Sequence, residues 1–145
     1  MVPATKFVTA IIPISKTNGA TAAGQIIDTK GWDYLQIGIV ASTADVVSNT
    51  INVLKLEEGD TTSSLATFAG AKQDTDFTIA TNAYTATTSD NAWAYGIDLR
   101  GRKRYLKVSV SPQTTMVIGA VGILSRGEKA PATAAEAGVL NAVYV

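Results

Sequence analysis

The chain has 145 residues, of which 46% are hydrophobic and 17% are charged, and it contains no cysteine and no histidine. A domain of this length buries roughly 70% of the surface that its unfolded chain exposes, so it can form a stable core without disulfides or structural metals. The missing residue types exclude disulfides, thiolate nucleophiles, imidazole bases and the commonest zinc ligands. Stability must therefore come from packing and association.

The formal net charge is zero, but the two signs are unevenly distributed along the chain. Up to Leu99 there are five Lys and Arg against ten Asp and Glu, whereas from Arg100 onward there are seven against two. This segregation favours an oriented protein surface over nucleic-acid binding. The first six residues lack the pattern of a secretory signal, and the longest apolar run, 116–124, is too short to span a membrane. We expect a soluble protein made in the cytoplasm that binds neither nucleic acid nor a membrane.

Alternation of apolar and polar residues with a period of two dominates the sequence and predicts strands. The first is expected at 7–14, where Pro13 favours an edge position. Asn-Gly at 18–19 is a tight-turn signal, after which 20–27 is expected to return. The next strand is expected at 34–41, with Leu35, Ile37 and Ile39 on its buried face.

Further strands are expected across the second half of the chain. In 50–57 the apolar phase slips by one residue, which indicates a bulge or burial of both faces. Residues 58–91 are rich in Thr, Ser, Ala, Gly and Asp and are expected to form loops and short strands. The clearest strand is 92–99, expected to form a hairpin with 105–110, and the apolar run 116–124 is expected to be a buried strand.

Seven to nine short strands separated by turn signals predict an all-β, single-domain β-sandwich that is jelly-roll-like. We expect the sandwich to occupy residues 1–125 and a C-terminal arm to occupy 126–145. Thr133 and Glu136 have the spacing of a capping box for one turn of helix. The arm ends in an apolar stretch that is costly to leave in water, which favours contact with a neighbouring subunit over a frayed end.

The sequence offers no motif for catalysis. It lacks the phosphate-binding patterns G-x-x-x-x-G-K-[ST] and G-x-G-x-x-G and the S-x-x-K signature, and a Ser-His-Asp triad is impossible without histidine. The acidic groups Glu57, Glu58 and Asp60, and Asp74 and Asp76, lack the spacing of an EF-hand and are expected to be solvated. We therefore expect no enzyme activity, no cofactor and no metal.

The basic residues that follow Leu99 form the most pronounced charge cluster. Guanidinium groups there are suited to pairing with carboxylates of a partner surface, although a solvated hairpin tip is an equally good interpretation. Together with the apolar tail, they give the predicted partner-binding residues: Arg100, Arg102, Lys103, Arg104, Lys107, Arg126, Val139, Leu140, Val143 and Tyr144.

Several stretches together form a recognisable pattern: residues 98–108 (DLRGRKRYLKV), 123–126 (ILSR), 128–131 (EKAP) with the Ala-rich tail, and 28–34 (DTKGWDY). In these stretches the chain resembles the head decoration (cement) proteins of tailed phages. The resemblance implies a β-sandwich or jelly roll that binds the outside of an expanded icosahedral shell, commonly as a trimer, and reinforces it against DNA pressure. It implies the major capsid protein and the chain itself as partners, the outer face of the virion as the location, and no catalytic residues.

Two other functions remain open from the sequence. One is a tail- or fibre-associated adhesion module that binds a glycan, with Trp32, Tyr84 or Trp93 as a stacking platform. The other is a hydrolase that uses a pair of Asp or Glu side chains, which requires two carboxylates to converge in a pocket.

Overall fold

The computed structural model describes residues 4–17, 19–42, 51–72, 74–77, 92–127 and 132–140. Within these ranges the regular structure consists of strands, and none of the residues forms a helix with the length and hydropathy needed to cross a membrane. The strands are β1 (Thr5–Lys16), β2 (Ala22–Ala23), β3 (Ile27–Asp28), β4 (Trp32–Ala41), β5 (Ile51–Thr61), β6 (Ser64–Lys72), β7 (Ala92–Asp98), β8 (Tyr105–Pro112) and β9 (Met116–Gly127).

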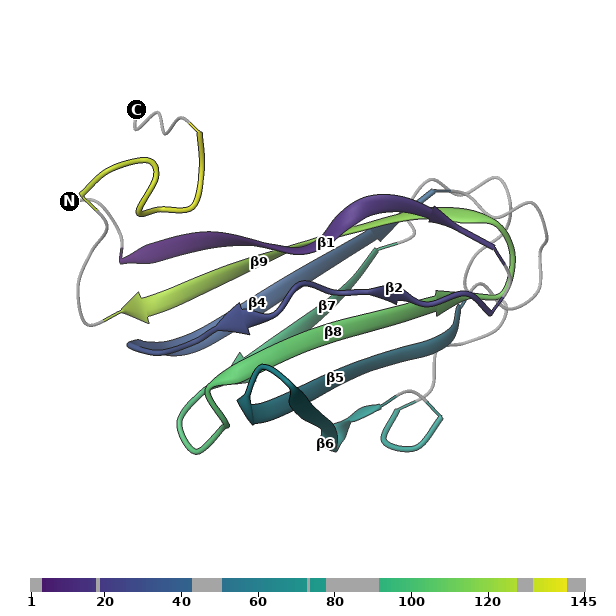
Figure 1. The fold of residues 1–145 in the computed structure, drawn as a ribbon, viewed down its shortest axis with the longest axis horizontal. Coiled ribbons are helices and arrows are strands. Elements are labelled where there is room, and N and C mark those ends of the chain that lie inside the picture. The colour runs from purple at the N-terminus through teal and green to yellow at the C-terminus, as the bar shows by residue number, and fades with distance from the viewer. Residues whose placement is uncertain are drawn as a thin grey trace.

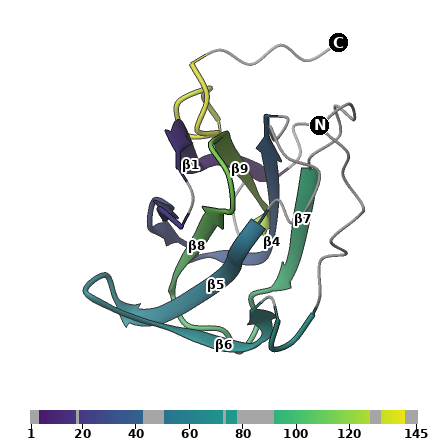
Figure 2. The same ribbon diagram turned by 90° about the vertical axis from the view of Figure 1, so that its right-hand side faces the viewer.

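The strands form two antiparallel sheets that pack face to face (Figures 1 and 2). The first sheet has the order β1-β9-β4-β7, and the second has the order β2-β8-β5-β6, with β3 also paired to β8. We count β2 and β3 as one interrupted strand. Among the described strands, the chain then passes repeatedly from one sheet to the other, and β5 and β6 are the only strands consecutive in sequence that also pair with each other. This is the eight-stranded jelly-roll arrangement, so the predicted fold class is confirmed.

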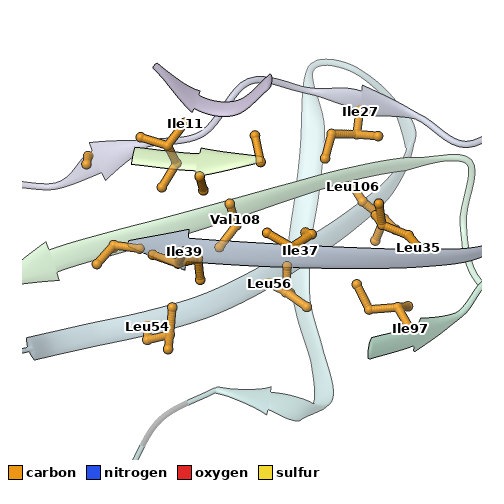
Figure 3. Close-up of a cluster of buried hydrophobic side chains, with 14 of the residues drawn as sticks. Ile11, Ile27, Leu35, Ile37, Ile39, Leu54, Leu56, Ile97, Leu106 and Val108 are labelled. Carbon is orange, nitrogen blue, oxygen red and sulfur yellow. The ribbon is translucent and has the colours of Figure 1, made fainter. Parts of the chain in front are cut away.

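The interior is filled by the alternating apolar residues of facing strands (Figure 3). Leu35, Ile37 and Ile39 of β4 are fully buried, as the alternation predicts. They lie opposite side chains of the second sheet such as Leu56 and Val108, which are also buried. A fully buried aliphatic side chain contributes about 1.5–3 kcal/mol relative to an exposed one, so this shared interior is the main source of stability.

Two local predictions are confirmed by the strand pairing. β1, which contains Pro13, is the edge strand of the first sheet, where the missing proline N–H does least harm. The pairing of β5 with β8 shifts register between Ile51 and Val53, which is the bulge indicated by the slip in apolar phase.

The hairpin predicted between 92–99 and 105–110 is wrong, because β7 pairs with β4 in the first sheet and β8 pairs with β5 in the second. The loop between them crosses from one sheet to the other. Each strand buries one face in the same interior, but from opposite sides, so alternation identifies the buried residues without identifying the sheet. The expected return of 20–27 onto the first strand is wrong for the same reason, since β2 and β3 pair with β8.

Residues 58–72 were expected to be loops and short strands, but they extend β5 to Thr61 and form the nine-residue β6. The two strands pair with each other, and β6 is the edge of the second sheet. Thr, Ser and Ala side chains suit an edge strand with a solvent-facing side, so polar composition there did not mean irregular structure. Residues 74–77 form a turn, and the rest of the predicted loop region, 73 and 78–91, lies outside the described residues.

The open side of the sandwich between β1 and β8 is closed by two backbone hydrogen bonds from adjacent residues. The N–H of Gly24 donates to the carbonyl of Val108 at 2.8 Å, and the N–H of Gln25 donates to the carbonyl of Ala10 at 2.8 Å. A Cβ atom at Gly24 would lie 2.2 Å from the Val108 oxygen and 2.8 Å from the Ala10 oxygen. Only glycine allows the chain to approach both sheets this closely.

We predict that Gly24→Ala lowers the free energy of unfolding by about 1–3 kcal/mol, because the methyl group forces the two sheets apart at this bridge. Urea denaturation monitored by circular dichroism measures the effect. The matched control is Gln25→Ala, which removes an exposed side chain but keeps the backbone bond and is expected to change stability by less than about 0.5 kcal/mol. Equal stability of the two variants would contradict the bridging role of Gly24.

Candidate interaction surfaces

The five basic residues between Arg100 and Lys107 each form an ion pair with a carboxylate of the same chain. All five carboxylates come from the acid-rich first part of the sequence, so the two oppositely charged parts meet in the folded molecule. The pairs join Arg100 to Asp98 (2.6 Å), Arg102 to Glu58 (3.6 Å), Lys103 to Asp60 (3.1 Å), Arg104 to Asp28 (2.6 Å) and Lys107 to Glu57 (3.4 Å). The loop therefore does not present a patch of unpaired positive charge, and its role as a partner anchor stays a prediction.

The pair between Arg104 and Asp28 joins the 99–104 loop to β3. Nε and Nη2 of Arg104 donate to the two carboxylate oxygens of Asp28, at 2.8 and 2.6 Å. The carbonyl oxygen of Arg104 also accepts hydrogen bonds from the N–H of Thr29 (3.0 Å) and from its hydroxyl (2.7 Å). The hydrogen bonds from Arg104 lower the pKa of Asp28, and the pKa of Arg104 is raised in turn.

A second group of charges lies on the solvent-facing side of β5 and β8. Oε1 of Glu57 accepts a hydrogen bond from Lys55 Nζ at 3.0 Å, and Oε2 accepts one from Ser109 Oγ at 3.3 Å. Lys107 Nζ lies 3.4 Å from the same Oε2 atom. Partial burial raises the pKa of Glu57, but the two lysines outweigh it, and the net shift is downward. The outer face of the second sheet is thus polar and charged.

The outer face of the first sheet is different, because it has a region without charged side chains. This region consists of three successive cross-strand rows of described residues together with Val117. The strand registers align Phe7, Ile123, Gln36 and Gly96 in one row, Thr9, Val121, Gly38 and Ala94 in the next, and Gly119, Val40 and Ala92 in the third. We call these twelve residues, Val117 included, the uncharged face.

Large apolar side chains on the uncharged face are open to solvent. Val40 is 61% exposed, Val121 51%, Val117 48% and Phe7 40%. Contiguous exposed apolar surface on a soluble domain marks an interaction site more often than scattered single residues do. Sequence reasoning missed this surface because the apolar run 116–124 predicted burial. The available signal was that apolar residues occupy both alternating sets of β9, and a sheet has only one inner face.

A polar recess of about 240 Å³ lies at one end of the first sheet and is lined by Asp33, Tyr34, Asp98, Arg100 and Arg126. Arg100 donates to both carboxylate oxygens of Asp98, at 2.9 and 2.6 Å, and these hydrogen bonds hold the pKa of Asp98 at about 2. Arg126, one of the predicted partner-binding residues, has a φ of 54° here. The carboxylate of Asp98 is ionised and engaged, so it is poorly suited to act as a general acid or base near neutral pH.

Residues 132–140, which belong to the predicted arm, form a compact turn beside β1 (yellow in Figures 1 and 2). The hydroxyl of Thr133 accepts a hydrogen bond from the N–H of Glu136 at 3.2 Å, which is one of the two hydrogen bonds of the predicted capping box. The carboxylate of Glu136 accepts from the N–H of Ala132 rather than from the cap residue. The N–H of Phe7 donates to the carbonyl of Ala137 at 2.7 Å, so the turn is attached to the edge of β1.

The apolar residues predicted for contact with a neighbour are only partly described. Val139 is half-buried, whereas Leu140 is fully exposed at the end of the turn. Val143 and Tyr144 lie outside the described residues. The boundary of the arm and its contact with a neighbouring subunit stay predictions.

Two of the three aromatic residues suggested as a glycan-stacking platform are described by the structure. Trp32 and Trp93 are half-buried and pack against the hydrophobic core, and Tyr84 lies outside the described residues. Across the described ranges, no group of three or more acidic side chains is arranged to hold a metal ion.

The fold and these surfaces define a jelly-roll domain with an exposed, uncharged outer face on its first sheet and ion pairs on the outer side of its second sheet. No protein-family model and no curated protein matches the sequence. Among solved structures, the chain is similar to the SPBc2 prophage-derived protein YomS, with a TM-score of 0.50 and 17% identity over 86% of this chain and 95% of that one. It is also similar to a chain of infectious bursal disease virus, Gx strain, with a TM-score of 0.52 and 15% identity over 89% of this chain and 33% of the viral chain. At these identities the likeness shows a shared fold.

We predict that Asp28→Asn lowers stability at pH 7 and that its difference from the wild type disappears in acid. The folded-state pKa of Asp28 is lowered, so its contribution is present above the unfolded pKa of about 3.9 and is lost as the pH falls through the folded value. Because the pair is about half exposed, we expect the difference at pH 7 to be about 1 kcal/mol or less. Urea denaturation at pH 7, 4 and 2.5 measures it.

Asp60→Asn is the control for this experiment, because the side chain of Asp60 is 75% exposed in its pair with Lys103 and should contribute little at any pH. A deficit of Asp28→Asn that stays constant down to pH 2.5 would show that the ion pair is not its cause.

Proposed function

We propose that this protein is a structural, non-enzymatic decoration protein that binds and stabilises the outer surface of an icosahedral phage head. The observation that carries the proposal is the uncharged face, a largely apolar, solvent-exposed surface on a jelly roll whose basic loop is neutralised within the chain. Such a surface suits adhesion to a large protein assembly. The sequence resemblance to phage head decoration proteins and the fold shared with a prophage-derived protein and with a virus chain support the same proposal.

Weak contacts are sufficient for this role because they are repeated. A shell presents the same site many times, and a bound copy is held at high effective concentration next to its neighbours, so modest contacts add up to stable attachment. The proposed partners are the major capsid protein and other copies of this chain, and the proposed location is the outer face of the virion. No cofactor, metal or nucleic acid enters the proposal.

We predict that virions of the phage that encodes this chain contain it in a number of copies equal to the major shell protein or to a simple fraction of it, because a lattice offers equivalent sites. Quantitative mass spectrometry of purified particles measures the ratio. Recombinant protein added to heads that lack it should co-sediment with them until sites are filled, and should raise the temperature at which they release DNA. A handful of copies per particle, or no co-sedimentation, would count against a decoration role.

A further inference from the structure

The uncharged face has a shape that is complementary to the same face of a second copy. In its central row, Val121 of β9 lies next to Gly38 of β4, and they are directly paired across the strands. Val121 projects into solvent, whereas an added Cβ at Gly38 would meet nothing within 4 Å. A projecting side chain beside an open hollow is self-complementary, because a two-fold axis between them sets each valine over the glycine of the other copy.

The charge distribution favours the same occupant. In a two-fold contact every residue meets the same patch on the other copy, so any net charge near the axis repels its own counterpart. The three rows of the uncharged face avoid this repulsion, whereas the outer side of the opposite sheet carries the partly buried ion pairs of Glu57 with Lys55 and Lys107. At the end of the first sheet the next row contains Asp98, which is paired with Arg100. Among the described residues at this end of the sheet, charge begins where the rows of the uncharged face end.

The size of the face predicts how strong such a contact is. Four strands about 4.8 Å apart and six residue steps of about 3.4 Å along β9 give roughly 400 Å² per copy, or about 800 Å² across the contact. This is below the ~1,200 Å² of a standard interface, which places the contact among weak, reversible ones. We therefore expect a dissociation constant on the order of 10–100 µM.

We propose that two copies of this chain associate face to face through the outer side of the β1-β9-β4-β7 sheet, about a two-fold axis between Val121 and Gly38. The charged outer faces of the second sheets then lie on the two outsides of the dimer. This assignment stands on the surface itself and does not require the partner to be a phage shell. A trimer, as the sequence resemblance implies, would need a second contact elsewhere, because a two-fold contact pairs copies.

Sedimentation equilibrium at 5–500 µM (roughly the range that brackets the expected constant) tests the proposal with two charge variants. Val121→Glu and Val121→Lys each place like charges near the axis and should weaken self-association roughly 100-fold or more. An equimolar mixture of the two should associate again, because opposite charges then face each other. Thr67→Glu and Thr67→Lys are the controls, since Thr67 is exposed on the outer side of β6 and lies opposite Glu57 in register. They should dimerise like the wild type.

The absence of cysteine makes a second measurement possible, because a single introduced thiol is the only labelling site. Spin labels on Val121→Cys should give a short distance between copies. Labels on Thr67→Cys should lie roughly 30 Å or more apart, because the stack of four sheets, spaced about 10 Å, separates them. The opposite order of distances would mean that the copies meet through the second sheet.

The results separate this proposal from the decoration role. A wild type that stays monomeric at 500 µM overturns the proposal, and if Val121→Glu then fails to co-sediment with heads, the uncharged face is the shell-binding surface instead. If the wild type dimerises and Val121→Glu is a folded monomer by circular dichroism, the proposal is supported whether or not either protein binds heads. Loss of head binding by every variant and by the wild type bears only on the decoration role.

Discussion

Burial of one face of each sheet against the other is the interaction on which the rest of the structure depends. The aliphatic side chains of β4 fill the space between the sheets together with those of β5 and β8 (Figure 3). With no disulfide and no histidine or cysteine for a metal, this interior has to supply most of the stability. It also fixes what faces outward, because the side chains of a strand alternate between the two sides of a sheet.

Many charged residues of the chain form ion pairs with each other at the surface around this interior. The loop that crosses from β7 to β8 brings the basic residues next to acids of β3 and β5, so formal charges far apart in the sequence cancel locally. Exposed pairs of this kind contribute little energy individually. Their effect here is to hold the crossover loop against β3 and β5.

The two outer faces consequently have different chemistry. The second sheet carries the partly buried ion pairs of a glutamate with two lysines on its outer side, whereas the first presents valines and a phenylalanine to solvent. An uncharged, exposed sheet face promotes aggregation of a protein that has to remain monomeric, and it provides a binding surface for a protein that works in an assembly. The proposed decoration role and the proposed face-to-face contact both use this asymmetry. The decoration role needs a contact surface within an assembly, and the face-to-face contact assigns that surface to a second copy of the chain.

The sequence by itself determined the strand class, most residues of the interior and the edge position of β1, and it reduced the phase slip in β5 to two alternatives, of which the structure shows the bulge. These features follow from local rules, because alternation and proline chemistry act over a few neighbouring residues. Only the tertiary structure decided which sheet each strand joins, and therefore that 92–99 and 105–110 do not pair. It also decided that Arg104 meets Asp28, 76 positions away, and that the apolar residues of β9 are divided between the core and a solvent-exposed face. Pairing between distant segments depends on how the whole chain closes around its interior, and no local pattern records it.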